Sequence, residues 1–265
     1  RARTSYPNYE IVCIDNIPDS QTAWKIWLQQ NADRVIQISE SFNWSRFNNL
    51  AAAACDSDYL LFLNDDIEIT QDDWLEALLE QAQRPDVGIV GPQLLYPSGK
   101  VQHAGMFLGA GIGRHALRFA PADDPGYFGL ALTQRNVIAV TGACMLMRRS
   151  LFEQLGGFDE AHSVINNDLD FCLRVHAAGL HTIFTPYASL LHHELASRER
   201  LPDVFDTSHF NSRWKTLFAA GDPYFSPLLS RFSDDYRPDD EAVQTIFAAH
   251  PLFQLQAQGQ AHAGE

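Results

Sequence analysis

The chain has 265 residues, of which 46% are hydrophobic and 20% are charged, a composition typical of a protein with a packed core. Its 33 acidic and 19 basic residues give a formal net charge of -14. A surface of that sign repels nucleic acid and anionic lipid headgroups, so a nucleic-acid-binding role is not expected. An acidic protein that binds a phosphorylated ligand needs a local cation, so metal-ligating side chains are expected at such a site.

Two features of the sequence bear on cellular location. No stretch reaches the roughly 18–20 apolar residues that span a bilayer, and no signal peptide is visible after Arg1. The four cysteines lie far apart in apolar runs and are predicted to be buried free thiols: Cys13, Cys55, Cys144 and Cys172. These features indicate a reducing, cytoplasmic compartment, with peripheral attachment to the inner membrane face as an open alternative.

Apolar runs alternate with amphipathic segments along the N-terminal part of the chain. Strands are predicted at 9–14, 34–38, 59–63 and 87–90, the last closed by Gly91-Pro92, and helices at 23–30, at 42–55 with Asn43 or Ser45 as cap, and from Thr70. This order predicts an α/β fold with a mixed, mostly parallel sheet flanked by helices. Ligands of such sheets bind at the carboxyl ends of strands. Asp15 and the run Asn64-Asp65-Asp66 both follow strand ends, so they are the first candidate site residues.

The second part of the chain has a less regular pattern. Glycines and prolines between 105 and 129 indicate a loop-rich stretch that could act as a flap. A long strand is predicted at 137–147, with a break at Gly142-Ala143 where backbone or ligand can approach closely. Beyond it, the pattern predicts helices at 151–155, 168–178 and 210–218, strands at 181–185 and 188–191, and a polar, loose end from about Gln254.

The adjacent carboxylates Asp65 and Asp66 follow a buried strand and repel each other unless a positive charge lies nearby. Mg2+ and Mn2+ prefer oxygen ligands, and Mg2+ often combines one or two protein carboxylates with the phosphates of a substrate. Together with Asn64, the pair is therefore a candidate clamp for a metal and a diphosphate. The alternative that these residues leave open is a loop with solvated or helix-capping acids.

Two further clusters follow in the C-terminal half. Asp168 lies in the first turn of a predicted helix, where it could act as a general base or simply complement the helix dipole. His192 and His193 follow a predicted strand, where an imidazole could bind a metal; the alternative is one core histidine and one surface histidine. Weaker candidates of the same kinds are His103 for a metal and, for a phosphate, Arg198 and Arg200.

The candidate residues occur within a series of ordered motifs. The motifs include YEIVCIDN, FNWSRFNNLAAA, YLLFLNDDIEI, VGIVGPQLLYPSGKVQHAG, AVTGACMLMRR, NNDLDFCLRVHAAG and TPYASLLHHE. Through them, roughly residues 5–230 resemble the family 2 glycosyltransferases, in particular the bacterial surface-polysaccharide and O-antigen branch. The resemblance implies a GT-A fold, a nucleotide-diphosphate sugar donor of the UDP, dTDP or GDP type, and a divalent metal cofactor, Mn2+ or Mg2+.

The resemblance also implies roles for individual residues. Asp15 corresponds to the acid that contacts the base or ribose of the donor. The run Asn64, Asp65 and Asp66 corresponds to the family's aspartate-any-aspartate motif, with asparagine in the first position. Within it, Asn64 and Asp65 are expected to contact the donor, and Asp66 is expected to be the direct metal ligand.

In the C-terminal half, Asp168 corresponds to the acid of the family's Glu-Asp motif, the presumed catalytic base. His192 corresponds to the histidine that completes the metal or diphosphate site, with His193 as the neighbouring alternative. Two departures stand out, because Asn64 and Asn167 occupy positions where many relatives have acids. The chain also starts at the family's second strand, and the preceding strand and helix, which form part of the nucleotide pocket, are expected to be missing.

Residues 1–230 are thus predicted to form a GT-A-like domain, and 231–265 a C-terminal extension. The expected reaction is the inverting transfer of a sugar to a hydroxyl of a glycan or lipid-linked glycan acceptor, in surface-polysaccharide synthesis. Two other functions stay open. One is a nucleotide- or glycan-binding module with impaired catalysis, and the other is a metal-dependent phosphohydrolase, for which the sequence shows no convincing phosphate-binding loop.

Overall fold

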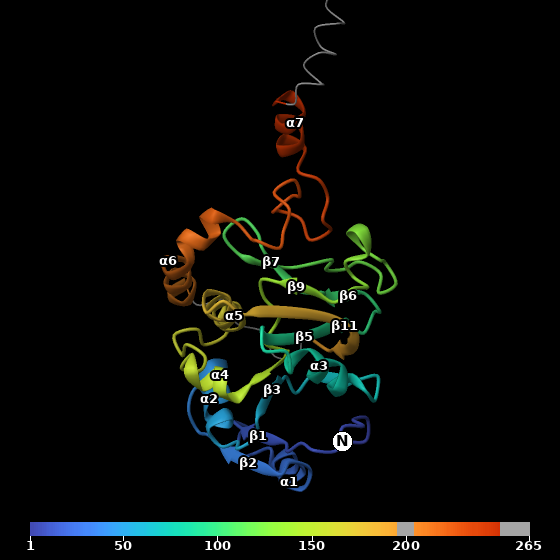
Figure 1. The fold of residues 1–265 in the computed structure, drawn as a ribbon. Helices are drawn as coiled ribbons and strands as arrows, with labels where there is room; N and C mark the ends of the chain where they lie inside the picture. Colours follow the sequence, from blue (N-terminus) through green and yellow to red (C-terminus); the bar gives the residue numbers. More distant parts are fainter. Residues whose placement is uncertain (195–203, 250–265) are drawn as a thin grey trace, which may run out of the picture.

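The computed structural model describes residues 1–194 and 204–249 of the chain. Its N-terminal part alternates strand and helix (Figure 1), as the sequence predicts. The elements are β1 (Val12–Asp15), α1 (Thr22–Asn31), β2 (Arg34–Gln37), α2 (Trp44–Ala53), β3 (Tyr59–Leu63), β4 (Ile67–Ile69), α3 (Trp74–Ala82) and β5 (Val87–Leu95). Helix α2 begins at a predicted cap, because the Asn43 side chain accepts a hydrogen bond from the backbone N–H of Arg46.

The following part contains many short strands. Its elements are β6 (Val101–His103), β7 (Met106–Leu108), β8 (Gly113–His115), the 3-10 helix η1 (Tyr127–Gly129), β9 (Arg135–Val137), β10 (Cys144–Arg148), α4 (Arg149–Gln154), α5 (Asn167–Ala177), β11 (His181–His192), α6 (Val204–Ala220) and α7 (Asp240–Ala249). The stretch 105–129, predicted to be loop-rich, therefore carries the antiparallel pair β7–β8.

The main sheet has seven strands, in the order β3-β10-β5-β11-β4, with β6 beside β5 and β9 beside β11. Strands β1 and β2 form a separate parallel pair. The sheet is mixed and flanked by helices, as predicted, but it contains fewer parallel pairs than expected. Strands β5 and β11 run parallel, whereas β10 is antiparallel to both β3 and β5. The reason is that the chain reaches β10 through a long excursion and re-enters the sheet in the opposite direction.

Helices cover both faces of the main sheet because successive side chains of a strand point to opposite faces. Cys144 and Leu146 of β10 pack in one buried cluster with side chains of α3. Met145 and Met147 of the same strand pack in a second cluster with side chains of α4 and α5. Both faces of the sheet are therefore covered, and the candidate residues follow strands that are buried on each face.

Two predicted boundaries in the N-terminal part are wrong. Thr70 does not open α3, because its hydroxyl donates to the carbonyl of Ser189 at 2.6 Å and the helix begins later, at Trp74. Strand β5 does not stop at Gly91-Pro92, because its parallel pairing with β11 continues there, with Pro92 opposite Thr185. In both places a contact with β11, far away in the sequence, decides the local structure.

Two predicted strand patterns differ in the second part. The single strand expected at 137–147 is two strands, β9 and β10, separated by a stretch that includes Gly142-Ala143. The two strands expected at 181–185 and 188–191 form one strand, β11, with an irregularity between Thr185 and Ser189. The small-residue break therefore ends one strand pairing and starts another.

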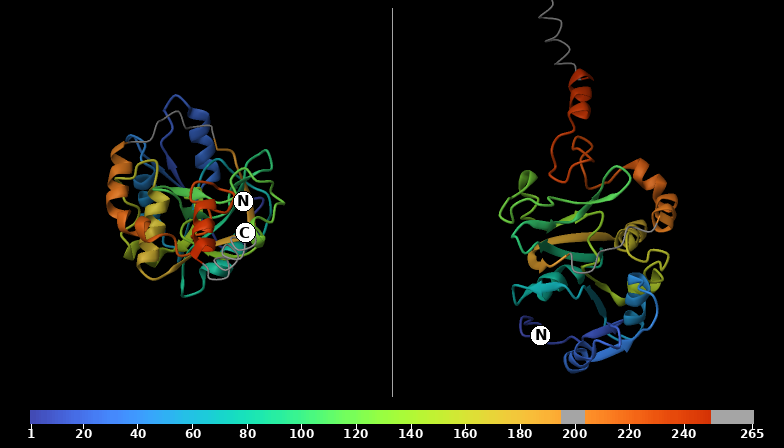
Figure 2. Two further views of the ribbon diagram at one scale, coloured as in Figure 1. Left: turned by 90° about the horizontal axis from the view of Figure 1, so that it is seen from above. Right: turned by 180° about the vertical axis from the view of Figure 1, so that it is seen from behind.

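The C-terminal part packs on the body before it extends away. Asp234 forms an ion pair with Arg114 of β8 at 2.7 Å, and Tyr236 is buried against Phe225. Helix α7 then projects from the body (Figures 1 and 2). The predictions for Arg198, Arg200 and the end from Gln254 concern residues outside those described.

All four cysteines are free thiols, as predicted. Cys144 and Cys172 are buried, whereas Cys13 and Cys55 are only partly buried. None of the helices in the described ranges is both long and apolar enough to cross a membrane.

Candidate functional site

The end of β3 and the start of β10 meet at one edge of the main sheet. Because these strands are antiparallel and in register, the residues after β3 face those before β10. The backbone N–H of Asn64 donates to the carbonyl of Ala143 at 2.9 Å. The Asn64 side chain accepts a long hydrogen bond, 3.4 Å, from the indole of Trp44. The first residue of the predicted metal clamp is thus held beside the break at Gly142-Ala143.

Asp66 lies between β3 and β4, opposite the end of β11. The backbone N–H of His193 donates to the Asp66 carbonyl at 2.9 Å, and Nε2 of the buried His192 lies 3.0 Å from Asp66 Oδ1. The ring of His193 points to the surface instead, where Nε2 lies 2.9 Å from Glu68 Oε2. The structure therefore brings Asp66 together with the imidazole of His192 but not with that of His193.

Asp168 lies in the first turn of α5 and faces the break before β10. Its Oδ2 accepts a hydrogen bond from the backbone N–H of Gly142 at 2.9 Å, and its Oδ1 accepts one from the N–H of Leu169 at 2.8 Å. A Cβ at position 142 would lie 2.9 Å from the ring of Trp44, so this approach needs glycine. Just before the helix, Asn166 has a φ of 63°, a left-handed conformation that asparagine adopts more readily than most residues. Backbone groups thus orient a half-buried carboxylate.

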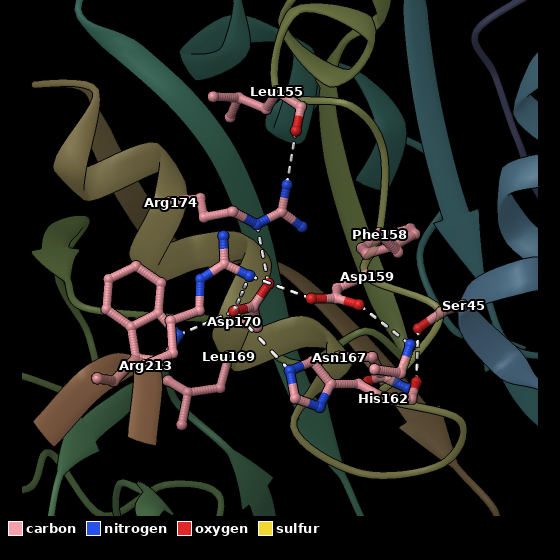
Figure 3. A network of polar contacts seen from close by, with 12 residues as sticks. Ser45, Leu155, Phe158, Asp159, His162, Asn167, Leu169, Asp170, Arg174 and Arg213 are labelled. Carbon is pink, nitrogen blue, oxygen red and sulfur yellow. Dashed lines mark hydrogen bonds and ion pairs between the residues drawn. The ribbon is translucent and has the colours of Figure 1, made fainter. Parts of the chain in front are cut away.

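Helix α5 is anchored by a fully buried carboxylate, Asp170 (Figure 3). It accepts hydrogen bonds from Nε of Arg174 and from the indole of Trp214, both at 2.8 Å. Nη1 of Arg213 lies 3.3 Å from the Asp170 carboxylate and 3.1 Å from that of Asp159. Because Arg213 and Trp214 belong to α6, these contacts hold α6 on α5 and fix the helix that carries the predicted base.

A group of ligand-type side chains lies next to this anchor. The ligand atoms of Asp159, His162 and His209 are within 4.8 Å of one another. The Arg213 guanidinium, however, lies 3.1 Å from the Asp159 carboxylate and supplies positive charge where a metal ion would otherwise supply it. The three residues are therefore better explained as part of the contact between α6 and the loop before α5.

A cavity of about 310 Å³ joins three of the predicted residues, Asn64, Asp168 and His192, whereas Asp66 lies just outside its lining, in contact with His192. It is lined by Asn64 after β3, Gly142 before β10, Asp168 of α5 and His192 of β11. Lining residues that the sequence did not nominate include Trp44, Gln102, His115, Arg118, Asn166 and Glu194. A more open hollow of about 470 Å³, near Arg3 and Asp72, contains none of the predicted residues. The base candidate and the histidine that contacts Asp66 thus share one cleft.

Asp15 and Asp65 lie outside this lining, on the β1 side of the molecule. Burial would raise the pKa of Asp15, but the N–H of Ile17 and the ammonium of Lys25, 3.1 Å away, lower it. Asp65 is exposed, and its charge adds to burial in raising the pKa of the Cys13 thiol, which places Asp65 near β1. The donor-binding role of the two acids stays a prediction.

His103, the weaker metal candidate, is fully buried behind the cavity wall. Its Nδ1 lies 3.0 Å from Nδ1 of His115, which lines the cavity. Burial lowers the pKa of both imidazoles, and the charge of Asp168 opposes this shift at His115. The structure therefore places His103 in a pair of neutral histidines, one layer behind the cavity.

Gln102 and Glu194, which no sequence pattern nominates, complete the polar wall of the cavity. Nδ1 of His192 lies 2.6 Å from Gln102 Oε1, and Gln102 Nε2 lies 2.9 Å from Glu194 Oε2. The available hint was position, because Gln102 precedes His103 and Glu194 follows His193. A pairing across 90 residues leaves no local signal in the sequence.

The pair Asp66 and His192 fits a divalent cation. Asp66 Oδ1 is buried and accepts no well-aligned hydrogen bond from the described residues. The distance between Asp66 Oδ1 and His192 Nε2 is 3.0 Å. A cation bound between this buried carboxylate oxygen and the imidazole nitrogen would satisfy both atoms as ligands.

The fold belongs to the GT-A class of glycosyltransferases. The chain resembles the crystal structure of GalNAc-T7 with UDP, GalNAc and Mn2+, with a TM-score of 0.61 and 14% sequence identity, over 79% of this chain and 43% of that one. At this identity the likeness establishes the fold alone.

Sequence comparisons define the family. Residues 1–156 match the family described as glycosyl transferase family 2, so the chain belongs to that family, as its motifs predict. It is 37% identical over 242 residues to the O-antigen biosynthesis protein RfbC of Myxococcus xanthus, covering 88% of this chain and 19% of that protein. It is 32% identical over 170 residues to the N-acetylglucosaminyl-diphospho-decaprenol L-rhamnosyltransferase of Mycobacterium tuberculosis, covering 59% of this chain and 54% of that enzyme. The chain thus spans less than two thirds of the length of either relative.

Proposed function

We propose that this protein is a metal-dependent, inverting glycosyltransferase of the cytoplasm. It transfers a sugar from a nucleotide-diphosphate donor to a hydroxyl of a glycan or lipid-linked glycan in surface-polysaccharide synthesis. The observation that carries the proposal is that Asp168 and His192, the latter in contact with Asp66, line one cavity. Family membership and the O-antigen relative support the reaction class and the process. The structural neighbour with UDP and Mn2+ supports the classes of donor and cofactor.

Asp168 is the base in this reaction. The N–H groups of Gly142 and Leu169 orient its carboxylate, and the lone pairs that they leave can accept the proton of an acceptor hydroxyl. The hydroxyl oxygen forms the new bond to the anomeric carbon while the bond from that carbon to the diphosphate breaks. A single displacement inverts the anomeric centre and needs no nucleophile from the protein. Burial raises the pKa of the Cys172 thiol to about 12, which makes it an unsuitable nucleophile.

Asp66 and His192 would hold Mn2+ or Mg2+ in this site. When bound, such an ion neutralises negative charge that develops on the diphosphate leaving group. Asn64 lies on the cavity wall and would contact the donor there, whereas Asp15 and Asp65 would contact it from the β1 side.

The proposal is tested first by binding and then by transfer. A thermal-shift screen of UDP-, GDP- and dTDP-sugars with Mn2+ should identify one donor class, because a ligand at about 100 times its Kd adds about 2.7 kcal/mol to the free energy of unfolding. Asp168→Asn should abolish transfer and keep this stabilisation, while Asp123→Asn, at an exposed acid outside the cavity, should leave both unchanged. Transfer by Asp168→Asn at the wild-type rate would exclude the base, and full activity in excess chelator would exclude the metal.

A further inference from the structure

A series of polar contacts leads from the proposed metal ligands to two residues of the cavity wall that the reaction above does not use. It runs from Asp66 through His192 and Gln102 to Glu194, with distances of 3.0, 2.6 and 2.9 Å between the contacting atoms. Gln102 lies on β6 and is buried, with 4% of its surface exposed. The series therefore links a candidate metal ligand to two residues that do not contact Asp66 themselves.

The direction of each hydrogen bond follows from the Gln102 amide. Its NH2 donates to Glu194 Oε2 at 2.9 Å, so the group that faces His192 is its carbonyl oxygen. A ring nitrogen 2.6 Å from a carbonyl oxygen must carry a hydrogen, so His192 is protonated at Nδ1.

A neutral His192 with a hydrogen on Nδ1 has a lone pair on Nε2. That lone pair faces Asp66 Oδ1, a second acceptor, 3.0 Å away. Two acceptors repel each other at this distance unless a cation, or a second proton on the ring, lies between them. Histidines that ligate metals commonly donate their other ring N–H to an outer partner in this way.

We propose that Gln102 and Glu194 are positioning residues for His192. They fix its tautomer and ring orientation, so that Nε2 and Asp66 are presented together to a divalent cation. This role rests on the metal binding proposed above for Asp66 and His192. Outer partners of this kind typically change metal affinity by about 10–100-fold. Gln102 and Glu194 thus set the affinity of the site for its metal without touching the metal or the substrate.

The first experiment measures the Kd for Mn2+ alone, by electron paramagnetic resonance of the free ion. Gln102→Met keeps the length of the side chain and removes its carbonyl, so we expect the Kd to rise by about 10–100-fold. The double variant Gln102→Glu with Glu194→Gln exchanges the two groups and keeps an acceptor toward His192, so we expect a Kd near that of the wild type. Gln93→Met is the matched control, because Gln93 is also buried, on the neighbouring β5, and accepts from Ser189 instead.

A second measurement reads the tautomer directly. In metal-free protein with nitrogen-15-labelled histidine, at a pH above the ordinary pKa of histidine, the ring nitrogens of His192 should show the chemical shifts of the Nδ1–H form. The signals are assigned by their loss in His192→Gln. Gln102→Met should shift them toward a mixture of tautomers, whereas a merely structural role for Gln102 would lower the melting temperature and leave them unchanged.

The outcomes separate this inference from the proposed function. If Asp66→Asn and His192→Gln leave the Kd for Mn2+ unchanged, the metal site is wrong and the positioning role is wrong with it. If those two variants raise the Kd, but Gln102→Met binds Mn2+ like the wild type and keeps the Nδ1–H form, only the positioning role is overturned. A higher Kd in Gln102→Met that the exchanged pair restores supports the positioning role.

Discussion

Removing the charge of Asp170 tests how α6 holds the helix that carries the predicted base. In Asp170→Asn, the guanidinium of Arg174, whose side chain is 12% exposed, loses its buried counter-charge. Arg213 also loses a carboxylate partner, but its side chain is 38% exposed and solvent screens its charge. An asparagine can still accept the hydrogen bond of the Trp214 indole, so the unpaired charge on Arg174 dominates the cost.

The size of the effect follows from burial. Breaking a buried ion pair by removing one partner costs about 3–5 kcal/mol. In a domain of this size 1 kcal/mol shifts the melting temperature by about 2–4 °C, so Asp170→Asn should lower it by roughly 6–20 °C. Arg213→Gln, which removes the exposed partner of the same carboxylate, should cost less than about 1 kcal/mol.

Thermal unfolding followed by circular dichroism, together with urea titration, measures both variants. The expected result is a large loss of stability in Asp170→Asn and a small one in Arg213→Gln. Equal losses in the two variants would refute the reasoning. They would mean that the loss of stability depends on the number of contacts to Asp170 and not on the buried charge of Arg174.

Three other changes have expected outcomes. Gly142→Ala should cost about 1–3 kcal/mol and slow transfer, because its Cβ would lie 2.9 Å from the Trp44 ring; melting temperature and transfer rate are compared with those of wild type. Folding lowers the pKa of His103 and His115. The stability that the two neutral histidines contribute is therefore fully present above the pKa of a histidine in the unfolded chain. It is lost as the pH falls toward their lower pKa in the folded protein. Urea titrations at about pH 7.5 and about pH 5.5 should show stability falling below about pH 6.5 by up to about 1.4 kcal/mol per pH unit for each histidine, and His103→Gln should reduce this slope. Asn43→Ala removes the cap of α2 and should cost about 1 kcal/mol in a urea titration at neutral pH.

Each of these expectations has a contrary result. Wild-type transfer by Gly142→Ala would show that Trp44 moves aside without disturbing the cavity. A stability that does not change between the two pH values would mean that the folded protein binds as many protons there as the unfolded chain does. An unchanged free energy of unfolding in Asn43→Ala would mean that water replaces the cap.

Local sequence signals were sufficient for elements whose decisive partners lie nearby in the chain. Asn43 caps α2 through Arg46, three residues further on, and β3 spans the residues that its apolar run predicted. Thr70 shows the limit of such signals. Its hydroxyl suits a helix cap, but it donates to the carbonyl of Ser189, 119 residues away, and a local pattern cannot register that competition.

The same distinction applies to the candidate site. Carboxylates and imidazoles at strand ends and helix starts have a chemical meaning by residue type, so Asp66, Asp168 and His192 could be nominated from the sequence. His193 was nominated with them because the sequence does not show which of two adjacent residues faces the site. Adjacent residues of a strand point to opposite faces, and the pairing of His192 with Ile67 of β4 separates the two histidines. Gln102 has no such meaning until the fold places its carbonyl 2.6 Å from a histidine ring.

The cavity is assembled from segments that span the chain from Trp44 to Glu194. Contacts between such distant segments form late in folding, because their loops must close first. Ligand binding to the complete cavity therefore adds its free energy to the stability of the whole domain. Inside a cell, a scarce ligand would then leave more of this protein open to proteolysis, so that its abundance would follow the supply of that ligand.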